Sequence, residues 1–281
     1  MKPSLLPLLA LPLALAAAPS ARGQTAAVAD SAAPLVVGET FTIASRRLGE
    51  LRRINVYLPP GYAASPQSRL PVLYMPDGGL AEDFLHVAGL VQVSVGNGTM
   101  RPFILVGIEN TERRRDMTGP TTVPEDRKIA PRVGGSAAFR DFLRDELMPE
   151  VRSRYRTTEE TAIVGESLAG LFVVETFLVE PDLFDTYMAF DPSLWWNGGA
   201  LSRAAGARPR GRAATKKTLW LAASADDVDS LTARLADALR KDAPAGLALH
   251  YEPMPEERHS TIYHPAALRA FRAVLAPPAG K

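Results

Sequence analysis

The chain has no cysteine among its 281 residues. That absence excludes disulfides, a thiolate nucleophile and any zinc site with Cys ligands. Charge of one sign is also missing, because 32 Lys and Arg residues nearly balance 31 Asp and Glu residues. Such a balance gives no electrostatic signature of nucleic-acid or anionic-membrane binding. No repeat of about 20 to 50 residues is present, and no linker rich in Pro, Gly or Ser divides the chain.

The N-terminus has the layout of a secretory signal peptide. Lys2 precedes an apolar run, Ser4–Ala18, which is short for a membrane span, and small residues follow it up to Gly23. We expect residues 1–23 to be removed, with cleavage after Ala21 or Gly23, and residues 24–36 to form a flexible leader. The alternative is an uncleaved N-terminal anchor. Cleavage predicts a periplasmic or secreted protein without stable membrane insertion, and lowers the formal charge from +1 to −1.

Short apolar runs alternate with helical patterns over residues 37–277. The chain is 46% hydrophobic, which suffices for a sizeable core. Strands alternating with helices predict one α/β domain, with a mostly parallel central sheet and helices on both faces. The stretch 119–135 has no clear period and is predicted to be a surface loop. The expected strands are 40–48, 53–58, 70–75, 102–108, 161–164, 186–190, 218–223 and 247–252, the last three buried, and the expected helices are 81–93, 137–155, 171–179, 230–240 and 265–275.

The segment Gly165-Glu-Ser-Leu-Ala-Gly170 contains the candidate nucleophile, Ser167. A serine between a strand and a helix lies on a sharp turn, where the two backbones approach closely and small neighbours are needed. The helix N-terminus offers N–H groups and partial positive charge to an oxyanion. Ala169 stands where the usual G-x-S-x-G pattern has its second glycine, and it is small enough to keep the turn. The other interpretation is a serine that caps a helix.

A serine nucleophile needs a base, and the chain has four histidines. His259 lies in a polar loop after the last predicted strand, where this architecture returns its base to the nucleophile, so we select it. His264, at the start of the last helix, is the second choice. His86 lies in the first helical stretch, and His250 lies inside a strand, where a structural role is expected.

The triad acid should follow the serine and precede the histidine, on the loop after the penultimate strand. Asp226 is ranked first there and Asp227 second, while Asp229 is expected to cap the next helix. Glu256 or Glu257, close to the base in sequence, are further alternatives.

The oxyanion hole should combine the N–H of Leu168 with one from the loop 75–79, for which Gly78 and Gly79 are the candidates. The other interpretation of that loop is an ordinary turn.

Several motifs in order resemble the putative-esterase family of α/β-hydrolases, which includes esterase D and the enterochelin and salmochelin esterases. The resemblance implies an α/β-hydrolase fold and a Ser–His–acid hydrolase without metal or organic cofactor, acting on a small-molecule ester. It also implies Ser167 as nucleophile, His259 as base and the Asp226 region as acid. The matching stretches are Val56–Tyr62, Leu70–Gly78, Val106–Asn110, Arg113–Thr118, Gly165–Leu171, Asp191–Trp196 and His259–Thr261.

On the same resemblance, Arg113, Arg115, Trp195 and Trp196 flank the active-site face. The arginines could hold an anionic or catechol-bearing substrate and the tryptophans could stack on a ring. The arginines could equally form a solvated loop that pairs with Asp116. The predicted function is serine ester hydrolysis through an acyl-enzyme, with a siderophore-type or aromatic ester or lactone as the candidate substrate. An acyltransferase on the same triad and a non-catalytic hydrolase-like binding protein are the alternatives.

Overall fold

A computed structural model describes residues 32–204, 216–241 and 246–278. The predicted signal peptide and residues 24–31 of the predicted leader lie outside the described residues. Contacts between Cα atoms group Val37–Lys281 into one compact unit, and the fold below is the fold of that unit. Over the described ranges, none of the helices combines the length and the apolar character that crossing a membrane requires.

The unit is built on one sheet of eight strands, in the order β1-β2-β4-β3-β5-β6-β7-β8. β1 pairs with β2 and β2 with β4 in antiparallel fashion, and every other pair is parallel. The predicted mostly parallel sheet is therefore confirmed. The strands are β1 Glu39–Ser45, β2 Glu50–Tyr57, β3 Leu70–Pro76, β4 Ile104–Ile108, β5 Thr157–Glu166, β6 Thr186–Phe190, β7 Lys217–Ser224 and β8 Leu247–Met254.

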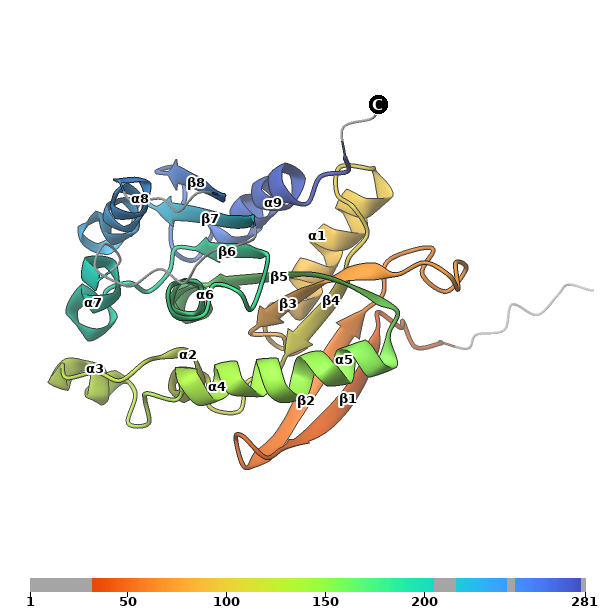
Figure 1. Cartoon of the computed structure of the whole chain (residues 1–281), viewed down its shortest axis with the longest axis horizontal. Helices are drawn as coiled ribbons and strands as arrows, with labels where there is room; N and C mark the ends of the chain where they lie inside the picture. Colours follow the sequence, from red (N-terminus) through yellow and green to blue (C-terminus); the bar gives the residue numbers. More distant parts are fainter. Residues whose placement is uncertain (1–31, 205–215, 242–245, 279–281) are drawn as a thin grey trace, which may run out of the picture. The chain divides into compact units, whose positions relative to one another are not determined.

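Helices cover both faces of the sheet, with α1 and α9 on one side and α4, α5, α6 and α8 on the other (Figure 1). The long connections between parallel strands are what place helices there. The helices are α1 Phe84–Gly96, α2 Arg113–Met117, α3 Pro124–Ile129, α4 Ser136–Phe142, α5 Met148–Arg154, α6 Ser167–Val179, α7 Trp196–Ala204, α8 Leu231–Lys241 and α9 Tyr263–Val274. A π-helical turn, η1 Leu143–Leu147, joins α4 to α5, and a 3-10 turn, η2 Val228–Ser230, precedes α8.

The central strands are buried on both faces because alternate side chains enter two separate cores. In β6, Tyr187 and Ala189 pack with α6, whereas Met188 and Phe190 pack with α9. This explains why these strands are continuous apolar runs in the sequence rather than alternating ones. The sheet thereby holds the carboxyl ends of β3, β5, β6 and β7 in a fixed row along one edge.

Besides shifted element bounds and the short helices α2 and α7, which were not predicted, three local features differ from the sequence prediction. The stretch 119–135 contains the short helix α3, whose Asp126 carboxylate accepts the N–H of Asn197. The predicted helix 137–155 is interrupted by η1, although its apolar side chains Phe139, Phe142, Leu143, Leu147 and Val151 are fully buried. The predicted buried strand at 247–252 is the edge strand β8, which is partly exposed because only one neighbour pairs with it.

Candidate active site

Ser167 lies at the tight turn between β5 and α6. Its φ of 61° is in the left-handed region, which a non-glycine residue adopts at a cost of about 1–3 kcal/mol. The turn depends on the small residues around it, since a Cβ on Gly165 would lie 2.7 Å from the backbone of Ala169. A Cβ on Gly170 would come within 3.1 Å of Pro192. The predicted close approach of strand and helix is therefore present, with Ala169 filling its tightest point.

His259 reaches Ser167 from the loop between β8 and α9. Its Nε2 lies 3.0 Å from the Ser167 Oγ, which is hydrogen-bond distance for a nucleophile and its base. Its Nδ1 lies 2.6 Å from Oδ2 of Asp191. The two ring nitrogens thus contact a hydroxyl and a carboxylate, which is the arrangement of a serine, a base and an orienting acid.

Asp191 directly follows β6, which pairs with β5, the strand that leads into Ser167. Its carboxylate accepts the backbone N–H of Ser224 at 2.9 Å and the Ser224 hydroxyl at 2.8 Å, besides its contact with the imidazole. Its φ of 42° places it, like Ser167, in the left-handed region. These bonds fix the carboxylate so that one oxygen is directed at Nδ1.

The structure differs here from the prediction for the acid. Asp226 accepts the backbone N–H of His259 at 2.9 Å, and its other oxygen lies 3.1 Å from Arg258. Asp227 accepts the N–H and hydroxyl of Thr232, so it caps α8 in place of the expected Asp229. The carboxylate at the imidazole is that of Asp191 because β6 lies nearer to β5 than β7 does. The alternatives Glu256 and Glu257 instead contact Arg269 and Thr261.

The electrostatics of this trio follow from its contacts. The pKa of His259 is raised, chiefly by its hydrogen bond to Asp191, against the opposing effect of burial, with the Glu166 charge adding to the increase. Burial raises the pKa of Asp191, but its bonds to His259 and Ser224 outweigh this and hold the pKa below its usual value. The site therefore favours an ionised Asp191 beside an imidazole that protonates readily.

The predicted oxyanion-hole residues fall into two groups. Leu168 is the second residue of α6, in the first turn, where N–H groups have no partner within the helix. The N–H of Gly78 donates to the carbonyl of Ile108 at the end of β4, so it is already used in backbone pairing. The N–H of Gly79 donates to the Glu82 carboxylate at 2.7 Å. Of the two glycines, only Gly79 could serve an oxyanion, and only after Glu82 moves.

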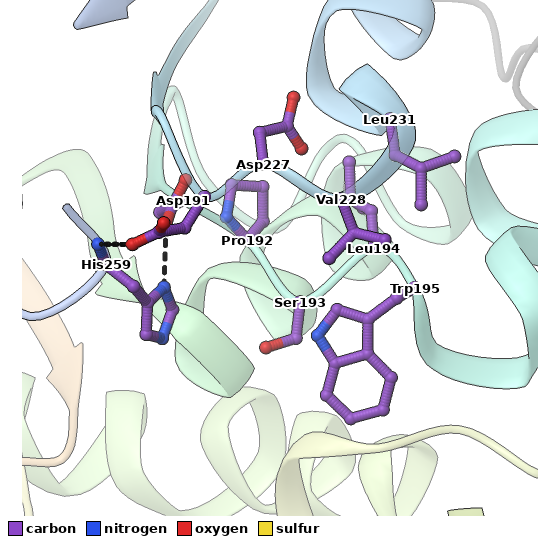
Figure 2. Close-up of a pocket in the computed structure, with 10 residues that line it drawn as sticks. Asp191, Pro192, Ser193, Leu194, Trp195, Asp227, Val228, Leu231 and His259 are labelled. Atoms are coloured by element: carbon purple, nitrogen blue, oxygen red, sulfur yellow. Dashed lines mark hydrogen bonds and ion pairs between the residues drawn. The ribbon is translucent and has the colours of Figure 1, made fainter. Parts of the chain in front are cut away.

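A pocket of about 140 Å³ opens beside His259. Figure 2 shows the His259 ring directed at Asp191, with the Trp195 indole beyond Ser193. Trp195 also lines an adjoining pocket of about 440 Å³, which includes Arg203 and Arg234. Trp196 is buried, and its indole N–H donates to the carbonyl of Gly119. Of the two predicted tryptophans, Trp195 is therefore the one that borders the pocket at His259.

The two predicted arginines have different environments. Arg113 donates through Nε and Nη2 to both oxygens of Asp77, at 2.7 and 2.8 Å, and remains 36% exposed. Arg115 instead pairs with Glu50 and the fully buried Asp116. Residues two apart on a helix point in different directions, so α2 cannot present both to one ligand. The pairing with Asp116 that was the alternative interpretation holds for Arg115 alone.

The remaining histidines lie away from Ser167. His264 and His86 contact each other at 3.0 Å between α9 and α1, and the exposed His250 stacks on Trp220. Across residues 32–204, 216–241 and 246–278, no group of three or more His, Cys, Asp or Glu side chains is arranged to hold a metal ion.

Comparison with known families gives one match that covers most of the chain. The profile of the Esterase family, described as "Putative esterase", matches residues 45–239. This range contains Ser167 and Asp191 and ends before His259.

Curated relatives include the Ferri-bacillibactin esterase BesA of Bacillus subtilis, 31% identical over 168 residues, or 53% of this chain and 56% of that protein. The Siderophore triacetylfusarinine C esterase of Aspergillus fumigatus is 30% identical over 183 residues, or 58% of each chain. The matched regions thus span little more than half of these relatives. The crystal structure of an IroE-like serine hydrolase from Shewanella oneidensis is similar with a TM-score of 0.74 and 30% identity, covering 85% of this chain and 80% of that one.

Proposed function

This chain belongs to the putative-esterase family, and from that premise we propose that it is a serine carboxylic ester hydrolase with Ser167, His259 and Asp191 as its triad. The observation that carries the proposal is the continuous chain of contacts from the Ser167 hydroxyl through both ring nitrogens of His259 to Asp191. The strained turn at Ser167, which is partly exposed, supports the same conclusion, since strain of this kind is retained where function requires it.

The proposed reaction has two acyl-transfer steps. Ser167 Oγ forms a bond to the ester carbonyl carbon as its proton passes to Nε2 of His259, and the carbonyl oxygen becomes an oxyanion near the N–H of Leu168. The carbon–oxygen bond to the alcohol then breaks, and Nε2 returns the proton to the leaving alkoxide. Water adds to the acyl-enzyme with its proton going to Nε2. Collapse of that adduct frees the acid and reprotonates Ser167.

Asp191 contributes by holding Nδ1–H and by stabilising the imidazolium that forms in each step. The His259 side chain is 46% exposed, so water can reach the acyl-enzyme. This access favours hydrolysis over transfer of the acyl group to a second alcohol.

For the substrate, we propose a siderophore-type ester or lactone. Two curated relatives are named as siderophore esterases, and the pocket beside His259 is bordered by Trp195, whose ring could stack on an aryl group. Arg203 and Arg234 in the adjoining pocket could pair with an anionic substrate. We also propose export through the N-terminal segment 1–23, which the N-terminal sequence of the mature protein would test.

The test is hydrolysis of a p-nitrophenyl ester and of a triester siderophore by the wild type, Ser167→Ala and His259→Ala. Both variants should lose at least about 10³-fold in kcat/KM with unchanged circular dichroism. Ser65→Ala, an exposed serine in the loop after β2, is the matched control and should keep full activity. An inactive wild type that also resists a fluorophosphonate label would refute the proposal and favour a binding protein.

A further inference from the structure

Glu166, the residue before the nucleophile, places a second carboxylate at the base. It ends β5, its side chain is only 15% exposed, and its Oε1 lies 3.3 Å from Nε2 of His259. The same Nε2 lies 3.0 Å from the Ser167 Oγ. One ring nitrogen therefore faces two oxygens, while Asp191 occupies the other.

The Ser167 hydroxyl and the Glu166 carboxylate favour opposite proton states of Nε2. As a base, Nε2 carries a lone pair that accepts the Ser167 hydroxyl, and an ionised carboxylate beside a lone pair is unfavourable. As part of an imidazolium, Nε2 carries a proton that the Glu166 carboxylate can accept. A protonated Glu166 could itself donate to Nε2 and so compete with the serine. Each proton state of Glu166 therefore changes how much of His259 is available as a base.

Charged and titratable groups from several elements surround Glu166. They are His259, Arg113, Asp191 and Asp83, and the buried Tyr263 hydroxyl also feels its charge. Burial raises the pKa of Glu166 to about 7, against the lowering effect of His259 and Arg113. Arg113 compensates Glu166 only in part, because its guanidinium is bound to Asp77. The pKa of His259 is raised as well, in part by the Glu166 charge, so the two groups titrate as a coupled pair.

We propose that Glu166 is a positioning residue that sets the proton occupancy of His259 and thereby the pH range in which Ser167 is activated. The inference rests on the proposed hydrolase function. The ionised carboxylate stabilises the imidazolium, so the acidic limb of kcat/KM lies at higher pH than Asp191 alone would place it. A unit charge at this distance, even with the screening of water, corresponds to about one pH unit.

The experiment compares pH profiles of kcat/KM for the wild type, E166Q and E159Q. E166Q keeps the shape of the side chain and removes its charge, so the acidic limb should move about one unit toward lower pH. E159Q removes the same charge from an exposed position on the same strand and should leave the limb in place. E166S, which also lacks the charge, should repeat the shift if E166Q is poorly folded.

The second readout is the His259 ring titration followed by NMR, which requires no activity. The ring pKa should fall in E166Q relative to wild type and E159Q. An unmoved or upward-moving ring pKa in a folded E166Q would overturn the inference, even if the wild type is a Ser167-dependent esterase. A ring shift in a protein without esterase activity would instead leave the Glu166–His259 coupling intact and refute the proposed function.

Discussion

Exchanging Asp191 for asparagine tests which acid orients the base. In D191N an oxygen in the place of Oδ1 can still accept the N–H of Ser224, while an amide group in the place of Oδ2 would face Nδ1 of His259 and the Ser224 hydroxyl. An amide N–H cannot accept the Nδ1 proton, so the ring would be driven toward the tautomer that carries its proton on Nε2. That tautomer has no lone pair for the Ser167 hydroxyl. The variant should therefore keep its fold, and its kcat/KM for ester hydrolysis should fall.

The size of the loss follows from the 2.6 Å contact between Oδ2 and Nδ1. Unit charges at that distance attract by about 6 kcal/mol at an effective dielectric constant of about 20, and by about 3 kcal/mol at about 40. The two values bracket the attraction, and the smaller one, from the higher dielectric constant, allows for the solvent at the His259 side chain, which is 46% exposed. The charge pair exists in full only when the imidazolium forms, so its loss should lower kcat/KM by about 10²- to 10⁴-fold.

Asp226→Asn is the matched control, because it removes an equally large carboxylate that also contacts His259, at the backbone N–H rather than at the ring. Its amide oxygen can still accept the His259 backbone N–H, so kcat/KM should fall by less than about tenfold. The assay is p-nitrophenyl ester hydrolysis across the pH range, with thermal melts to confirm folding. A larger loss in D226N than in D191N would refute the assignment of Asp191 and restore the acid predicted from the sequence.

Two further predictions concern the framework of the site. Gly165→Ala should destabilise the protein by about 1–3 kcal/mol and reduce activity, because its Cβ would overlap the first turn of α6. Gly89→Ala is the control, since there is open space around that position, and it should be neutral or stabilising in urea melts. Arg52→Ala should cost about 1–3 kcal/mol of unfolding free energy, because it removes the fully buried member of the two arginines that pair with Asp116 and leaves Oδ2 of that carboxylate without its bond. Arg53→Ala, which removes an exposed arginine from the same strand, should change it by less than about 1 kcal/mol, and equal losses in the two variants would contradict the argument.

Much of the site could be predicted from local sequence. Ser167 was identifiable because a strand, a small-residue turn and a helix are consecutive in the chain. The loop that contains His259 was identifiable because it follows the last strand. Both inferences use short segments whose structure is set by neighbouring residues. The contact between the two side chains follows from the parallel sheet, which brings the carboxyl ends of its strands to one edge.

The carboxylate that contacts the His259 ring could not be selected in the same way, since it depends on lateral distances across the sheet. Asp191 and Asp226 both follow buried strands, and both lie between Ser167 and His259 in the chain. A signal was present: Asp191 directly follows β6 and stands before a proline within a motif that matched the family. The sequence placed Arg115 beside Arg113 at the substrate because α2, which contains both, has too few residues to show a helical period. In the helix the two side chains point in different directions.

The order of strands explains why the contacts of His259 are divided as they are. Its loop leaves β8 and must cross the ends of β7 and β6 to reach Ser167 at the end of β5, with neighbouring strands about 4.8 Å apart. At β7, Asp226 holds the His259 backbone N–H, and at β6, Asp191 holds Nδ1. At β5, Nε2 meets Ser167 and Glu166. Each strand end along this path contacts a different part of His259. The carboxylate at Nδ1 therefore has to come from the strand next to the one that leads into Ser167, and a carboxylate one strand further away can hold only the loop.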